Sequence, residues 1–220
     1  MKDQERSVLQ GFVVLEGIDG TGTTTQLRRL EAVFARRGIP AWTSFEPTEL
    51  PTGAFVRRVL SGEVPALPGT IARLFAADRH EHLFGQGGAI ERLERGELVV
   101  FDRYLFSSLA YQGMDCGMEL PMLLNADFPL PELLLFFDLD VDTAMSRVAK
   151  RPGRDIYETH EALEKVREAY ARAMAPFQAS SMRIHRIDAA LPLDEVSKVV
   201  DSALEPIVAR MQLHFQAGNH

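Results

Sequence analysis

The glycine-rich segment LEGIDGTGTTTQL, from Leu15 to Leu27, constrains the fold more than any other stretch of the chain. It follows the apolar run FVVLE and leads into a long amphipathic pattern, which predicts a strand, a tight turn and a helix. Gly17, Gly22 and Thr24 fit the phosphate-loop pattern G-x-x-x-x-G-K-[ST], but Thr23 stands at the lysine position. The segment therefore predicts an anion site without its usual side-chain cation, although a ligand-free glycine turn would give the same pattern.

Strand patterns and helix patterns alternate along the rest of the chain. The expected strands are short apolar runs rich in β-branched and aromatic residues, at 11–16, 41–45, 97–102, 132–140 and 182–188. The expected helices carry apolar residues at helical spacing, at 23–38, 141–151, 160–177 and 193–211. Alternation of this kind predicts an α/β fold with a mostly parallel five-stranded sheet and helices on both faces. Ligands of such sheets bind outside the carboxyl ends of the strands.

Composition limits the kinds of protein that this chain can be. Its 220 residues, 46% of them hydrophobic, favour a single domain over residues 1–220, with polar tails at about 1–9 and 214–220. A net charge of −7 disfavours a nucleic-acid-binding protein. The longest apolar run, LLLFF, is far below the roughly 18 residues of a membrane helix. A single cysteine, Cys116, and an N-terminus without an apolar core predict a cytoplasmic location.

Three further segments carry a specific resemblance. They follow the phosphate loop in the order SFEPTELPTGAFVRRVL (44–60), LFAADRHEH (74–82) and VVFDRYLFSSLAYQG (99–113), and a basic segment, KRPGRDIYE (150–158), comes later. In this order they closely resemble the thymidylate kinase family, over about residues 11–177. The resemblance implies a P-loop kinase fold and transfer of the γ-phosphate of ATP to dTMP with Mg²⁺. It also implies a homodimer whose ligands are small nucleotides, with no nucleic acid and no membrane as partners.

The same resemblance implies which residues bind the acceptor nucleotide. The family arginine that matches Arg79 reaches the thymine edge, and the phenylalanine that matches Phe75 stacks on the base. An arginine donor suits the O4 acceptor of thymine, whereas cytosine has an amino donor there; Phe75 alone would more often be a core residue. Tyr111, beneath C2′, would exclude a ribonucleotide, but it could equally be a packed tyrosine. The implied substrate-binding residues are Glu46, Arg57, Phe75, Arg79, Arg103, Ser108, Tyr111 and Gln112.

Charged side chains at the strand ends suggest a metal and phosphate site. Asp102 ends an apolar strand and Arg103 follows it, so that a carboxylate and a guanidinium emerge at one sheet edge. We expect Thr24 and Asp102 to hold Mg²⁺; the alternative is an ordinary Asp–Arg surface pair. By resemblance, Arg103 holds the acceptor phosphate and Asp19 approaches the sugar and phosphate, although Asp19 could be a turn aspartate. The implied ATP-binding residues are Gly17, Ile18, Asp19, Gly20, Thr21, Gly22, Thr23, Thr24 and Thr25.

A basic cluster offers a replacement for the missing lysine. Arg147, Lys150, Arg151 and Arg154 lie in a predicted lid at about residues 147–158, although a basic run at a helix end is usually only solvated. Family members without an arginine in the phosphate loop carry catalytic basic residues in the lid, and this loop has none. Arg151 or Arg154 is therefore predicted to stabilise the transferring phosphate. The expected catalytic residues are Arg103, Asp19, Arg151 and Arg154.

Departures from the family pattern leave other functions open. Phe45 stands where many members have arginine, and the residues after Glu46 and Pro47 read TEL rather than Gly-Gly-Thr. One alternative is another nucleoside-monophosphate kinase of the same fold. The other is a nucleotide-binding protein without turnover, which Thr23 itself would support.

Overall fold

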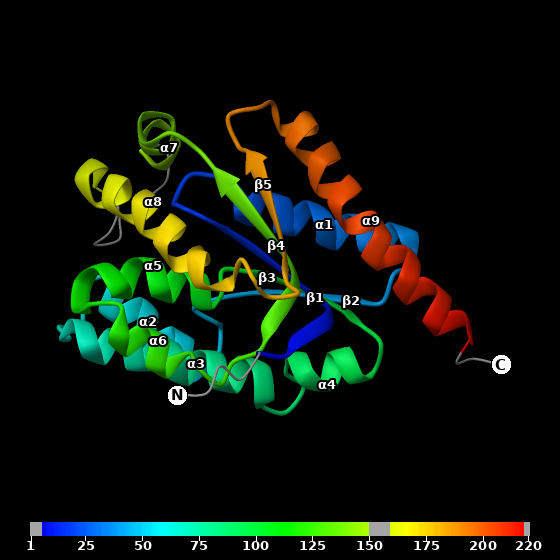
Figure 1. Ribbon diagram of the computed structural model, residues 1–220, viewed down its shortest axis with the longest axis horizontal. Coiled ribbons are helices and arrows are strands. Elements are labelled where there is room, and N and C mark those ends of the chain that lie inside the picture. The colour runs from blue at the N-terminus through cyan, green and yellow to red at the C-terminus, as the bar shows by residue number, and fades with distance from the viewer. Residues whose placement is uncertain (1–5, 150–158, 218–220) are drawn as a thin grey trace.

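The computed structural model of the protein describes residues 6–149 and 159–217, and it is built around one five-stranded sheet (Figure 1). The strand order is β2-β3-β1-β4-β5, and every neighbouring pair in this sheet is parallel. The prediction of a parallel five-stranded α/β fold is confirmed. The strands are β1 (Val8–Gly17), β2 (Ala41–Phe45), β3 (Leu98–Asp102), β4 (Leu130–Asp138) and β5 (Arg183–Asp188).

Helices occupy the connections between the strands. They are α1 (Thr23–Arg37), α2 (Pro51–Leu60), α3 (Pro68–Phe84), α4 (Ala89–Glu94), α5 (Leu105–Cys116), α6 (Glu119–Leu124), α7 (Val141–Val148), α8 (His160–Met174), the 3₁₀ turn η1 (Ala175–Phe177) and α9 (Leu193–Ala217). Strand β1 begins at Val8 and α9 continues to Ala217, so both elements extend into the residues that we expected in polar tails. Within the described ranges, no helix is long and apolar enough to cross a membrane.

Burial explains the different composition of the central and edge strands. The C-terminal part of β1 and all of β3 are buried, and so is β4 except for its last residue. These strands are covered on both faces, which is why they read as continuous apolar runs. The edge strand β5, with the sequence RIHRID, buries Ile187 while its other residues remain exposed. Charged side chains along an edge strand oppose pairing with another sheet.

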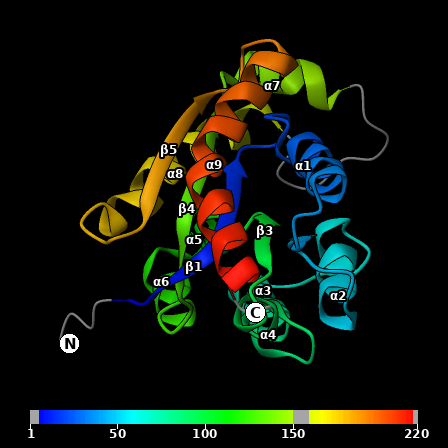
Figure 2. The same cartoon turned by 90° about the vertical axis from the view of Figure 1, so that its right-hand side faces the viewer.

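The order of the strands places the two covering layers and the ligand crevice. The chain moves from β1 to β2 in one direction across the sheet and from β3 to β4 in the other. Right-handed crossovers therefore put α1 and α5 on opposite faces. Helix α9 packs with β1 and β5, and Figure 2 shows it crossing in front of the sheet. The connections diverge at the carboxyl ends of β1 and β3, where crevices form in folds of this type.

Candidate active site

The turn after β1 has the backbone geometry of an open anion site. Gly20 and Gly22 adopt left-handed conformations, with φ of 90° and 92°. A Cβ atom on Gly20 would lie 2.6 Å from the carbonyl oxygen of Ala144 in α7, so the loop and α7 are in close backbone contact. Gly22 precedes the first residue of α1 and brings no capping side chain. The N–H groups at the start of α1 therefore face a site in which an anion can replace a cap.

The threonines of the loop have separate environments. The Thr21 hydroxyl donates to the Ile18 carbonyl at 2.8 Å and closes the turn from inside. Thr23 is buried as the first residue of α1, and the next hydroxyl, on Thr24, donates to Asp102 Oδ2 at 2.6 Å. The predicted pair Thr24 and Asp102 is therefore brought together.

The Thr24–Asp102 pair has the chemistry of a magnesium site. Asp102 is 5% exposed, and its Oδ1 atom has no hydrogen-bond partner among the described residues. A buried carboxylate oxygen without a donor suits a hydrated cation. Proteins usually hold Mg²⁺ by one or two oxygen ligands together with substrate phosphates. The residues therefore fit the ion, and no cluster of three or more His, Cys, Asp or Glu suited to a metal occurs in the described part of the chain.

One cleft lies beside the loop and the start of α1, and we call it the second cleft. It is lined by Gly20, Thr21, Gly22, Thr25, Gln26, Arg147, Ala189, Leu191, Leu193 and Val196. Arg147 closes one wall by donating to the carbonyl oxygens of Ala189 at 3.1 Å and Gly20 at 3.4 Å. The sequence pattern places Arg147 in the predicted lid and does not include it among the catalytic or binding residues. Its position follows from the approach of α7 to the loop, which the sequence pattern did not indicate.

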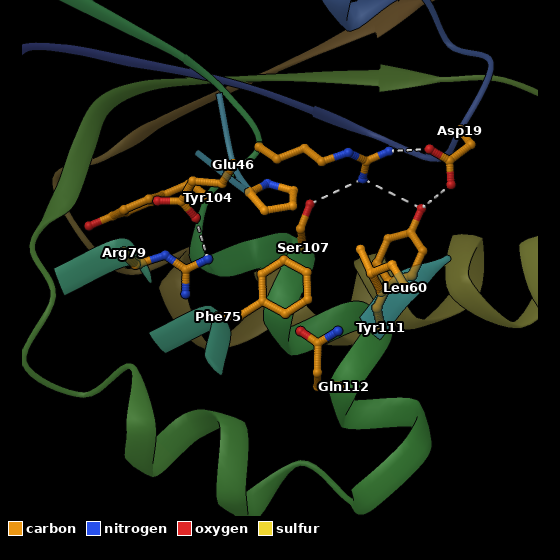
Figure 3. A pocket seen from close by; sticks show the side chains of 11 residues that line it. Asp19, Glu46, Leu60, Phe75, Arg79, Tyr104, Ser107, Tyr111 and Gln112 are labelled. Atoms are coloured by element: carbon orange, nitrogen blue, oxygen red, sulfur yellow. Dashed lines mark hydrogen bonds and ion pairs between the residues drawn. The ribbon is translucent and has the colours of Figure 1, made fainter. Parts of the chain in front are cut away.

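The main cleft lies beneath the carboxyl ends of β1 and β3 (Figure 3). It encloses about 540 Å³ of empty space, part of it open to solvent. Its lining is Asp19, Glu46, Pro47, Leu60, Phe75, Arg79, Arg103, Tyr104, Ser107, Tyr111 and Gln112. Most of the predicted acceptor residues are thus together in one cavity, with Phe75 half-buried beside the Gln112 amide.

Arg103 lies where the cleft meets the phosphate loop. Its backbone has φ of 73°, the left-handed value that a non-glycine residue rarely adopts, and its N–H donates to Leu15 O at 2.9 Å. Nη2 donates to Asp19 Oδ1 at 2.6 Å, and Nη1 is 3.2 Å from the Gly17 carbonyl. Tyr111 completes a triangle by donating to Asp19 Oδ2 at 3.0 Å. One guanidinium therefore contacts the loop and the cleft together.

Electrostatics keep Arg103 and Tyr111 in fixed protonation states. Burial alone would lower the pKa of Arg103, but the oxygens of Tyr111, Asp19, Tyr170 and Asp102 hold the pKa well above its usual range. Burial raises the pKa of Tyr111 far above that of a free tyrosine, against the effect of Arg103. At neutral pH, Arg103 is a cation and Tyr111 is a neutral hydrogen-bond donor.

Arg79 forms the other charged group of the cleft. Its side chain is 1% exposed, and Nη2 donates to Glu46 Oε2 at 2.5 Å and to Ser108 Oγ at 3.1 Å. Nη1 donates to Asn125 Oδ1, while Nε has no hydrogen-bond partner among the described residues. Ser108 therefore lies behind Arg79 and does not line the cavity, and Asn125 is a supporting residue that the sequence did not reveal.

The residue before Arg79 holds the segment that departs from the family pattern. Asp78 is buried on α3 and accepts hydrogen bonds from Thr48 N at 2.8 Å, Thr48 Oγ1 at 2.6 Å and Thr52 Oγ1 at 2.7 Å. Adjacent residues of one helix thus bind Glu46 and Thr48. Thr48, the first residue of the TEL sequence, gives Asp78 two of these three donors, so the departure is accommodated locally.

Some predicted residues do not join the cavity. Arg57 is exposed on α2 and donates to the Pro47 carbonyl at 2.7 Å, outside the lining. Arg151 and Arg154, with most of the predicted lid, lie outside the described residues. Cys116 also lies outside the lining: burial raises its pKa, and its sulfur donates to the Gln112 carbonyl.

Three residues near Arg103 were missed by sequence reasoning. Glu16 is fully buried near the end of β1, Ser107 lies in the first turn of α5, and Tyr170 is fully buried on α8. A glutamate closing an apolar strand just before the glycine loop was the available signal. Tyr170 gave no signal, because it lies on the apolar face of an ordinary amphipathic helix.

Comparison with known proteins gives a consistent result. Residues 15–200 match the family model described as "Thymidylate kinase". A Treponema pallidum protein, provisionally named a thymidylate kinase, is 44% identical over 74% of this chain and 79% of its own length. The thymidylate kinase of Alkalilimnicola ehrlichii is 36% identical over 90% of this chain and 94% of its own, and that of Leptospira borgpetersenii is 36% identical over 74% and 80%.

Proposed function

The chain belongs to the thymidylate kinase family, and on this premise we propose that it transfers the γ-phosphate of ATP to dTMP, giving dTDP and ADP for dTTP synthesis. The observation that carries the proposal is the position of Arg103, whose guanidinium contacts Gly17 of the phosphate loop while lining the main cleft. A cation at this junction can bind an acceptor phosphate directly in front of the donor. Phosphoryl transfer depends mainly on such positioning and charge stabilisation.

We propose that the main cleft binds dTMP with its base between Phe75 and Arg79. The Gln112 side chain is 2% exposed, and its Oε1 has no hydrogen-bond partner among the described residues. The Nε atom of Arg79 is similarly buried and unpaired. A pyrimidine edge that offers both donors and acceptors would satisfy these groups. A base that left them unpaired would be rejected, because unpaired buried polar groups are costly.

The sugar and phosphate of dTMP are assigned to the opposite end of the cleft. Arg103 would bind the phosphate, displacing part of its contact with Asp19, and Asp19 and Tyr111 would flank the sugar. Arg57 lies on α2 beside this end and would turn from the Pro47 carbonyl to the phosphate. Glu46 and Ser108 would act indirectly by holding Arg79 in place.

We assign the donor nucleotide to the phosphate loop, from Gly17 to Thr25. The β- and γ-phosphates would lie on the loop N–H groups, and the second cleft beside Arg147 has room for the rest of ATP. Thr24 and Asp102 would hold Mg²⁺, which supplies charge neutralisation and orientation of the phosphates. The chain itself supplies the N–H groups, the Thr24 hydroxyl and the Asp102 carboxylate.

Thr23 leaves the donor phosphates without a cation from the loop. Loss of one well-placed donor costs about 10²–10³ in rate in sites of this kind. An arginine supplied from outside a loop contributes about 10³–10⁵ in related enzymes. We therefore retain the proposal that Arg151 or Arg154 supplies this charge from the lid. We also propose a cytoplasmic homodimer, with the exposed apolar residues Leu67 and Phe84 of the α3 region and Leu123 of α6 at its contact surface.

The proposed function is tested by ADP release from the purified protein with ATP and Mg²⁺. The acceptor panel is dTMP, dUMP, dCMP, AMP and thymidine, with calorimetric binding of dTMP in parallel. We expect turnover with dTMP above all others. A higher rate with another acceptor would assign a different substrate, and tight dTMP binding with no ADP release would identify a binding protein.

The charge supplied by the lid is tested by Arg151→Ala and Arg154→Ala in the same assay. At least one variant is expected to lower kcat by about 10²-fold or more. The matched control is Arg172→Ala, because Arg172 is exposed on α8 and pairs with Glu168 at 3.9 Å. Full activity in both lid variants would refute compensation by these arginines while leaving the kinase assignment intact.

A further inference from the structure

Behind Arg103, on the side away from solvent, lies a buried carboxylate to which the proposed mechanism gives no role. Glu16 is the next-to-last residue of β1, directly before Gly17, and its side chain is fully buried. It accepts hydrogen bonds from the backbone N–H groups of Tyr104 at 2.8 Å and Ser107 at 3.1 Å. It also accepts from the hydroxyls of Ser107 at 2.6 Å and Tyr170 at 2.9 Å. Four donors converge on this one carboxylate.

The two hydroxyls that bind Glu16 also bind Arg103. Arg103 Nη1 is 3.2 Å from Ser107 Oγ and 3.3 Å from the Tyr170 hydroxyl oxygen. Each hydroxyl has one proton and can also accept. When both protons are directed to Glu16 Oε2, the two oxygens present lone pairs to the guanidinium. The ionised carboxylate thus determines which way the hydroxyls face.

We propose that Glu16 is a positioning residue for Arg103, acting through the hydroxyls of Ser107 and Tyr170. This inference rests on the proposed function, since it assigns Arg103 the acceptor phosphate. Asp19 holds the guanidinium from the solvent side and would yield to that phosphate, whereas Glu16 holds it from within and remains in place. Because Glu16 belongs to β1, Ser107 to the first turn of α5 and Tyr170 to α8, the arrangement fixes Arg103 against three elements together.

Protonation of Glu16 would weaken this arrangement. Its Oε1 atom accepts the two backbone N–H groups, so a proton must reside on Oε2, where the hydroxyls bind. One hydroxyl oxygen would then accept from Glu16, which leaves a lone pair fewer for Arg103, and the anion behind the guanidinium would disappear. Burial raises the pKa of Glu16 to about 7, against hydrogen bonds from Ser107 and the charge of Arg103. The charged and titratable groups that act on Glu16 are Arg103, Tyr104 and Tyr170, while Asp19, Asp102 and Tyr111 act on Arg103.

The first test needs no turnover. The ¹⁵N-labelled guanidinium of Arg103, assigned with an Arg103→Lys sample, is followed by NMR through the neutral pH range in the parent and in Glu16→Gln. We expect the Arg103 resonances of the parent to shift with a midpoint near pH 7 and those of Glu16→Gln to lack this titration. Arg103 resonances that titrate equally in both proteins, or in neither, would overturn the proposal whatever the substrate is.

The second test is the pH profile of ADP release with dTMP. In the parent, kcat is expected to rise through about pH 7. Glu16→Gln should lack this limb and, above pH 7, lower kcat by about tenfold with a smaller change in the KM for dTMP, as loss of a charged hydrogen-bond partner predicts. Tyr170→Phe and Ser107→Ala should lower kcat but keep the limb, because the carboxylate remains.

The control for these variants is Glu132→Gln, another carboxylate buried against β1. Glu132 accepts from Gly11 N at 2.8 Å and pairs with Arg210, at the other end of the sheet. It should retain the parent kcat and pH limb. A parent that releases no ADP would refute the proposed function and leave the NMR result to decide the role of Glu16. A working parent whose limb survives in Glu16→Gln would refute the inference alone.

Discussion

The main cleft and the phosphate loop meet at Arg103, yet their polar groups come from different parts of the chain. In the cleft, charged side chains are already paired, as Arg79 is with Glu46 and Arg103 with Asp19. In the loop, the groups that face a ligand are backbone N–H groups and the Thr24 hydroxyl, while Thr23 contributes no charge. Under the proposed function, acceptor recognition is therefore built into the folded chain, whereas positive charge for the donor comes from outside the loop when the donor binds.

The largest expected effect tests whether the cleft is held by its own charge pairs. Arg79→Met leaves Glu46 buried without its partner, and breaking a buried pair costs about 3–5 kcal/mol. We expect a loss of this size in the free energy of unfolding, measured in denaturant. The exposed pair Arg58–Glu63 is the control, since Arg58→Met should leave the free energy of unfolding close to that of the parent. Equal losses in both variants would show that the buried pair of the cleft contributes no more to stability than an exposed surface pair.

The next effect tests whether the two regions depend on one guanidinium. Arg103→Ala is expected to lower kcat by about 10²–10³, or about 3–4 kcal/mol, because among the described residues only the Arg103 cation contacts both Gly17 and Asp19. ADP release with dTMP measures it. Arg73→Ala, on the exposed side of α3, serves as the control and should remain near the parent rate. A loss of less than tenfold in Arg103→Ala would show that the cleft and the loop do not depend on this one guanidinium.

A smaller effect concerns stability and pH. The pKa of Glu16 rises from 4.5 to about 7 on folding, so the folded protein binds this proton more tightly than the unfolded chain does. Its contribution to stability is complete below about pH 4.5 and is lost as pH rises through about 7. Relative to Glu16→Gln, the parent should lose about 2–3 kcal/mol between these limits. Unfolding free energies with the same pH slope in both proteins would contradict this prediction.

The smallest effect restores charge to the loop. Thr23→Lys is expected to lower the KM for ATP by up to about tenfold, or 1.4 kcal/mol, with little change in the KM for dTMP. Steady-state kinetics with each substrate varied in turn provide the measurement. Equal changes in both constants would place residue 23 away from the donor phosphates and weaken the contrast between the regions. Ser202→Lys is the control, because it adds the same charge at an exposed residue of α9 and should leave both constants unchanged.

The sequence predicted the sheet well because its central strands are buried on both faces and leave an apolar signature. It also indicated most of the cleft, since motif residues such as Phe75, Arg79 and Tyr111 come together there. It could not show that Ser108 and Asn125 lie behind Arg79, because support of this kind depends on packing between separate helices. The sequence could not predict the role of Tyr170 for the same reason. Its helical pattern predicts burial, but its hydroxyl contacts Arg103 only because α8 packs on α5.

The close contact between Gly20 and Ala144 limits which substitutions the phosphate loop can accept. A side chain at residue 20 would meet the α7 backbone at 2.6 Å, so an arginine cannot be introduced there without moving the helix. A Cβ atom at Gly22 would meet nothing within 4 Å, but a φ of 92° penalises any L-residue. Thr23, in contrast, begins a helix with ordinary backbone geometry. Of these three positions, residue 23 is therefore the one at which a cationic side chain can return to the loop without a backbone change.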